Sequence, residues 1–149
     1  LAVINLLGTV FMDSLDCPFK TADALLERAK SDGVKIVIID MHAEATAEKK
    51  ALAFYLDGRV SAVFGTHTHV QTADAQVLPA GTGFITDVGM TGPFVSVLGV
   101  KPEQSIARMK DKVPVRFQNA DGKCILGGAV FDIDEKSGLC RCAEPVRVF

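Results

Sequence analysis

The sequence predicts an α/β fold in the order β-α-β-α-β, followed by an antiparallel meander. Short apolar runs rich in β-branched residues alternate with segments of helical periodicity over the first half of the chain. The last third alternates apolar with polar residues and is divided by turn-forming residues. The 149 residues, 48% of them hydrophobic, show no linker or repeat, so we expect a single domain over 1–149.

The first half is expected to contain three strands and two helices. A run such as KIVIID is typical of a strand buried on both faces of a parallel sheet. Thr21 is placed to cap the first helix, and Gly58 to stop the second. The expected elements are a buried strand over 1–7, a helix over 21–33, a strand over 35–40, a helix over 46–57 and a strand over 60–64.

The second half is expected to be mostly strand. A glycine-rich loop, DVGMTGP, covers 87–93, and Pro102 suits the first position of a short helix. Turn signals such as NADG separate the alternating segments that would form the meander. The expected strands cover 76–78, 83–86, 113–118, 123–134 and 139–149.

Composition limits the class of protein and its compartment. Sixteen basic against eighteen acidic residues give a net charge of −2, which argues against a general nucleic-acid binder. No apolar run approaches the ~18 residues of a membrane helix, and the start is not a signal peptide. We expect four free, buried thiols in a reducing cytoplasm, with a disulfide from Cys124 to Cys140 or Cys142 as the alternative. Cys140 and Cys142 are expected on one face of a strand.

All three histidines follow neighbouring predicted strands. His42 comes two residues after the KIVIID strand, and His67 and His69 follow the next strand in the sequence GTHTH. The carboxyl ends of parallel strands open on one edge of a sheet, where ligands bind. Imidazole is the commonest side-chain ligand for transition metals, and positions i and i+2 of an extended segment project to one side. The sequence therefore predicts a metal site built from His42, His67 and His69.

Four carboxylates near these histidines have open roles. Asp40 is expected either to face the metal site or to orient a histidine ring from behind. Glu44 alternatively favours the N-terminus of the following helix, and Asp87 alternatively caps its own loop. Gly65 is expected to let the backbone turn tightly before the histidines. The candidates are Asp40, Glu44, Asp74 and Asp87.

Three stretches resemble one family. DMHAEATAEK, GTHTHVQTAD and ITDVGMTGP, over 40–49, 65–74 and 85–93, are similar to segments of the YmdB-like bacterial metallophosphoesterases. These are calcineurin-like phosphoesterases described as 2′,3′-cyclic nucleotide 2′-phosphodiesterases. The resemblance covers only the C-terminal part of the family's protein, and the chain starts at Leu1 without an initiator Met. We therefore expect the distal portion of an α/β/β/α sandwich, with the N-terminal part absent.

The resemblance also implies residue roles. His42 and His67 would bind one divalent ion and His69 a second, with iron, manganese or zinc as the metal. The glycine-rich loop would line the substrate side, with backbone N–H groups meeting phosphate. Its alternative role is a turn near a subunit contact. The substrate-binding residues implied are Gly89, Thr91 and Gly92.

The function implied is cytoplasmic hydrolysis of a small phosphodiester, such as a cyclic nucleotide, by a hydroxide that two metal ions activate. In the intact protein this chain would supply the histidine ligands, and homo-oligomers are possible. The chain alone is expected to have incomplete metal sites and very low activity. One alternative is a mononuclear hydrolase with three histidine ligands. The other is a non-catalytic binding or assembly module that pairs through an exposed sheet edge.

Overall fold

The centre of the molecule is a five-stranded sheet. The computed structural model describes residues 1–13 and 15–149. Four strands run parallel and the fifth, β4, is antiparallel at one edge, which confirms the predicted α/β class. In spatial order the strands are β1 (Ala2–Leu7), β2 (Val37–His42), β3 (Ala62–Thr66), β5 (Gly83–Ile85) and β4 (Gln76–Val77).

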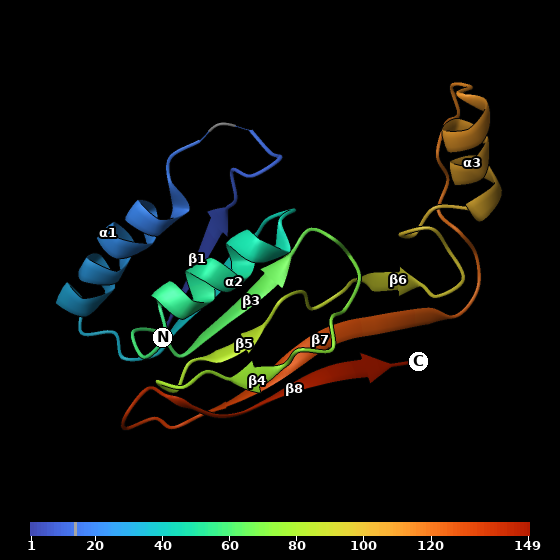
Figure 1. Cartoon of the computed structure of the whole chain (residues 1–149). Helices are drawn as coiled ribbons and strands as arrows, with labels where there is room; N and C mark the ends of the chain where they lie inside the picture. The colour runs from blue at the N-terminus through green and yellow to red at the C-terminus, as the bar shows by residue number, and fades with distance from the viewer. Residues whose placement is uncertain (14) are drawn as a thin grey trace.

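Two helices, α1 (Pro18–Ser31) and α2 (Thr46–Tyr55), lie on the same side of the sheet (Figure 1). The core between these layers includes Ile39 and Met41 of β2 and Leu52 of α2. Helix α1 begins three residues before the predicted cap at Thr21, so that prediction was wrong. A proline in the first helical turn has its φ angle already set for a helix and lacks an N–H that would stay unsatisfied there.

The other face of β1 is open. Ile4 and Leu6 are buried under the helices, whereas Val3 is 64% exposed and Leu7 is 43% exposed. The expectation of a fully buried strand over 1–7 was therefore wrong, because β1 is an edge strand with helices on one face only. The KIVIID strand likewise alternates buried with half-buried positions rather than being buried on both faces.

A second, antiparallel sheet packs beside β4 and β5 (Figure 1). The backbone N–H of Cys140 donates to the carbonyl of Gly81 at 2.8 Å and joins the two sheets. At Gly83 an added Cβ would lie 2.6 Å from the ring of Phe131, so glycine allows this close approach. The second sheet consists of β6 (Thr91–Pro93), β7 (Cys124–Ile133) and β8 (Cys140–Val148) in that order.

The segment between β6 and β7 departs from the predicted meander. A short helix α3 (Pro102–Ile106) continues as a π-helical turn, η1 (Ala107–Asp111), and stands apart from the sheets (Figure 1). Residues 113–118 form no strand, although a single bridge joins Asn119 to Val100. Pro114 within the segment cannot donate to a ladder. Within 1–13 and 15–149, no helix is both long and apolar enough to cross a membrane.

The cysteines differ from expectation at β8. The register shifts between Asp132, opposite Cys142, and Ile133, opposite Cys140, so Arg141 is an extra residue on β8. Such a bulge breaks the alternation of side chains. Cys140 is therefore buried and Cys142 exposed, and the prediction of a shared face was wrong. All four thiols are free, but only Cys140 is buried.

Gly65 lies inside β3 rather than in a turn. Close packing explains why a glycine occupies this position. An added Cβ would lie 1.8 Å from the carbonyl oxygen of Thr86, a backbone atom that cannot move aside. We expect Gly65→Ala to lower the free energy of unfolding by about 3 kcal/mol or more, as severe overpacking does. Gly128→Ala is the control, because its added Cβ meets only Leu126 Cδ2 at 3.9 Å. Equal urea midpoints for the two variants would contradict this explanation.

Candidate metal centre

The ends of β2 and β3 bring two histidines together. His42 is the last residue of β2 and pairs with Thr66, the last residue of β3. His67, the residue after Thr66, therefore lies close to His42. The two imidazole rings meet edge to face with their centroids 4.9 Å apart. The His42 Nε2 atom lies 3.1 Å from His67 Nδ1. The predicted meeting of the two loops at one sheet edge is thus observed for this pair.

A short chain of hydrogen bonds fixes the tautomer of His42. The Thr66 hydroxyl donates to Asp40 Oδ1 at 2.8 Å, since an ionised carboxylate only accepts. Thr66 Oγ1 must then accept from His42 Nδ1, which lies 3.0 Å away. Asn5 Nδ2 donates to the other Asp40 oxygen at 2.9 Å. His42 therefore carries its proton on Nδ1 and presents a bare lone pair on Nε2.

Glu44 lies beside the second ring. Its Oε2 atom is 3.1 Å from His67 Nε2. The Nδ1 atom of His67 faces the lone pair of His42 Nε2. Of the two open roles of Asp40, the geometry thus matches that of an orienting group, and Glu44 contacts His67 directly.

A proton shared between His42 Nε2 and His67 Nδ1, or a cation bound by both, satisfies this contact. Two nitrogens that each lie about 2.0–2.1 Å from one metal ion are roughly 2.8–3.4 Å apart for bond angles between octahedral and tetrahedral values. The observed 3.1 Å separation of His42 Nε2 and His67 Nδ1 fits this range. Oriented imidazoles backed by carboxylates are also typical of metal-ligating histidines. The residues present therefore fit one end of a divalent cation site.

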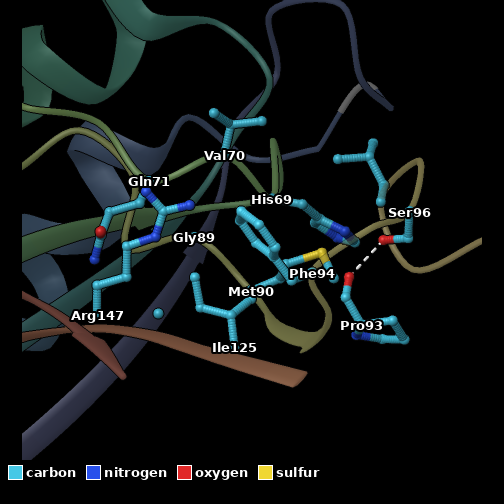
Figure 2. A pocket seen from close by; sticks show the side chains of 12 residues that line it. His69, Val70, Gln71, Gly89, Met90, Pro93, Phe94, Ser96, Ile125 and Arg147 are labelled. Atoms are coloured by element: carbon cyan, nitrogen blue, oxygen red, sulfur yellow. Dashed lines mark hydrogen bonds between the residues drawn. The ribbon is translucent and has the colours of Figure 1, made fainter. Parts of the chain in front are cut away.

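His69 lies apart from this pair. The φ angles of His67 and His69 are 96° and 64°, so the segment is left-handed rather than extended. The alternation that predicted a common direction for the two side chains does not hold there. His69 instead lines a separate cavity (Figure 2). In the described part of the chain, no three His, Cys, Asp or Glu side chains are placed to hold one metal ion, and a ligand role for His69 stays a prediction.

A buried ion pair holds the strained histidine segment. Asp87 Oδ2 accepts hydrogen bonds from the backbone N–H and the hydroxyl of Thr68, at 3.1 and 2.6 Å. Thr68 lies between the two histidines, so these bonds fix the backbone on both sides of it. Lys49 Nζ, on α2, lies 2.8 Å from the same oxygen, and both side chains are almost fully buried. This pair explains how an unfavourable backbone conformation persists at the site.

The electrostatics of Asp87 follow from these contacts. Burial alone would raise the pKa of its carboxyl group, but the hydrogen bonds from Lys49, Thr68 and Gly89 outweigh it and lower the pKa. The carboxylate is therefore charged wherever the fold is intact near neutral pH. Sequence patterns made Asp87 only one of four candidates and missed Lys49, because a lysine on an amphipathic helix ordinarily faces solvent.

The remaining candidates have structural partners. Asp74 accepts hydrogen bonds from the backbone N–H and hydroxyl of Thr86, and Lys50 contacts it at 3.3 Å. The Gly89 N–H donates to Asp87 Oδ1 at 2.9 Å, so it is already engaged. Thr91 and Gly92 form β6, pairing with β7, rather than a loop. A substrate-binding role for Gly89, Thr91 and Gly92 stays a prediction.

The fold and the paired imidazoles define the class of protein. The chain is an α/β protein whose paired imidazoles lie at the carboxyl ends of two adjacent parallel strands, the edge where such sheets ordinarily bind ligands. A family model described as YmdB-like protein matches residues 1–146, and the chain belongs to this family. The resemblance seen in the three sequence motifs is thereby confirmed.

Two curated relatives carry functional names. A Bacillus subtilis (strain 168) protein described as a 2′,3′-cyclic-nucleotide 2′-phosphodiesterase is 56% identical over 137 residues, covering 92% of this chain and 52% of the relative. A putative phosphatase/phosphodiesterase of Mycoplasma pneumoniae is 39% identical over 150 residues, covering 98% of this chain and 52% of that protein. The chain thus spans about half the length of the curated relatives it matches.

Solved structures share the fold. A hypothetical protein from Thermus thermophilus superposes with a TM-score of 0.90 at 44% identity, covering 98% of this chain and 56% of that one. A Mycoplasma pneumoniae protein described as a novel phosphatase superposes with a TM-score of 0.87 at 38% identity, covering 98% of this chain and 53% of that one.

Proposed function

We propose that this protein is a metal-dependent phosphodiesterase that hydrolyses small cyclic nucleotides and uses two divalent cations. The observation that carries the proposal is the pair of imidazole nitrogens, His42 Nε2 and His67 Nδ1, which face one another 3.1 Å apart. The name of the Bacillus subtilis relative supports the reaction class. Free thiols at all four cysteines are in keeping with the cytoplasmic location we propose.

The histidines of this chain would contribute metal ligands. His42 and His67 would hold one cation, and we propose His69 as a ligand of the second. Imidazole ligands suit iron, manganese and zinc. Bound divalent cations supply an activated water and neutralise charge on phosphate oxygens.

Positioning falls to the surrounding side chains. Asp40, through Thr66, holds the His42 ring in the ligating tautomer, and Glu44 lies beside His67. Asp87 and Lys49 hold the backbone between the histidines. We propose that Thr91 and Gly92, which follow Gly89 at the start of β6, face the phosphate.

The test uses a chimera in which this chain replaces the part of the Bacillus subtilis relative that it matches. We expect the chimera to hydrolyse 2′,3′-cyclic AMP with Fe²⁺, Mn²⁺ or Zn²⁺, and to lose activity on chelation. The isolated 149-residue chain is expected to turn over very slowly with the same metals. A folded chimera that is inactive with every metal, or equally active after chelation, would overturn the proposal.

The same samples distinguish the two other functions. A mononuclear three-histidine hydrolase would show one tightly bound ion and full activity in the isolated chain. The separate location of His69 gives that function no support. An assembly module would form a dimer that survives chelation and binds no metal.

A further inference from the structure

A cavity of about 260 Å³ opens beside His69, between the β6 segment and the β7–β8 hairpin (Figure 2). Its walls combine apolar side chains, among them Met90, Phe94 and Ile125 of β7, with polar ones such as Arg147. Because His69 follows His67 by two residues, its Cα lies within about 7.6 Å of the His67 Cα. His69 thus links the cavity wall to the chain segment that carries His67.

Two of the four polar side chains of the cavity wall, Ser96 and Gln71, are hydrogen-bonded within the protein. The Ser96 hydroxyl donates to the carbonyl of Pro93 at 2.6 Å and accepts from the Gly99 N–H at 2.9 Å. The Gln71 amide donates to the carbonyls of Gly128 and Val146, each at 2.8 Å. These hydrogen bonds hold the Ser96 hydroxyl and the Gln71 amide nitrogen in place on the wall.

Arg147 and His69 are the two other polar side chains of the wall, and Arg147 lies beside aromatic rings. In the described part of the chain its guanidinium group forms no ion pair. It lies instead 5.6 Å from the Phe94 ring and 5.5 Å from the Phe149 ring, and these two rings meet edge to face at 5.1 Å. An arginine plane and an aromatic ring together form a surface on which flat rings stack.

We propose that this cavity is the nucleobase subsite of a nucleotide substrate, a proposal that rests on the function proposed above. A base would stack against Phe94 and the Arg147 guanidinium while its ribose phosphate extends past His69 toward the metal centre. The Phe94 ring beside the Arg147 guanidinium is the feature that favours a flat ring over a bare phosphate. The size also suits a small ring system, because whole drug-sized ligands occupy roughly 300–1,000 Å³.

Binding is tested first without metal or catalysis. Adenosine, which has a base but no phosphate, is titrated into the metal-free chain while NMR signals of Met90 and Ile125 are followed. We expect these signals to shift and the shifts to saturate. Phe94→Ala and Arg147→Met are each expected to weaken binding about tenfold, within the range measured for stacking contacts.

Controls separate stacking from other effects. Phe117→Ala removes a matched ring beside an arginine, Arg108 at 5.3 Å, in the α3–η1 segment, and is expected to leave binding unchanged. Inorganic phosphate is titrated in parallel. Shifts of the Met90 and Ile125 signals by phosphate but not by adenosine would make the cavity an anion site and overturn the proposal. Adenosine that leaves these signals in place would overturn it as well.

The chimera then separates failure of the subsite from failure of the proposed function. Phe94→Ala should raise KM for 2′,3′-cyclic AMP about tenfold. It should leave hydrolysis of base-free ribose 2′,3′-cyclic phosphate unaltered. Equal effects on both substrates would overturn the subsite but not the phosphodiesterase. Loss of all hydrolysis in the unaltered chimera would instead overturn the function, and the adenosine titration would then decide whether the cavity binds a base.

Discussion

Replacing His67 by alanine is expected to abolish measurable binding of a divalent cation at the pair formed with His42. Outer partners of metal ligands alone typically contribute 10–100-fold in affinity, so removal of a ligand should cost at least about 100-fold. The measurement is a competition titration of Zn²⁺ between the chain and a chromophoric chelator. His42→Ala should give the same result, because the two nitrogens lie 3.1 Å apart on one proposed ion.

A matched variant separates binding from folding. His67 has a φ angle of 96°, where a residue with a Cβ is strained and glycine is not. His67→Gly should therefore lose the metal while the free energy of unfolding rises by about 1 kcal/mol. Glu44→Gln and Thr66→Val should lower the affinity by about 10–100-fold, since they act only on the orientation of the rings. Full zinc affinity in His67→Gly would refute the assignment of this ligand.

Replacing Lys49 by methionine is expected to cost about 3–5 kcal/mol in the free energy of unfolding, because it leaves the buried Asp87 carboxylate without its partner. Urea denaturation measures this change. Lys50→Met, one residue along, is the control, since Lys50 contacts Asp74 in a pair whose side chains are 42% and 27% exposed. Exposed pairs contribute about 0–1 kcal/mol. Similar losses for the two variants would contradict the importance of the buried pair.

The pair also predicts a pH dependence. The fold lowers the pKa of Asp87 below the ordinary value of 3.8. Its contribution to stability is therefore complete above about pH 4 and is lost as the pH falls through the lowered pKa of the folded state. Asp87→Asn should flatten that part of the curve of unfolding free energy against pH. A curve of unchanged slope below about pH 4 would mean that other carboxylates are responsible.

The parallel sheet and the meeting of His42 with His67 were predictable from local sequence. Buried β-branched runs followed by histidines place those side chains at one sheet edge whatever the rest of the chain does. The helix start at Pro18 and the missing strand at 113–118 were not, because a proline and the lack of a pairing partner decided them. The hydrophobic periodicity of the sequence predicts neither the helix start at Pro18 nor the missing strand.

The detailed geometry of the site could not be predicted from local sequence. The left-handed backbone at His67 and His69 depends on Asp87, which is held in turn by Lys49 from α2. The bond from Thr68 to Asp87 spans 19 positions and the pair of Lys49 with Asp87 spans 38, so no local pattern contains this arrangement. Gly65 shows the same limit, since its close approach to Thr86 arises only when β3 and the segment after β5 pack together.

The central claim is that His42 Nε2 and His67 Nδ1 share one divalent cation. Crystals of the chain grown with excess Zn²⁺, with data collected at the zinc absorption edge, test it directly. We expect an anomalous peak between these two imidazole rings, with Thr66 and Glu44 still bound to their outer nitrogens. Zinc bound only elsewhere, or no anomalous peak between the two rings at saturating Zn²⁺, would contradict the claim.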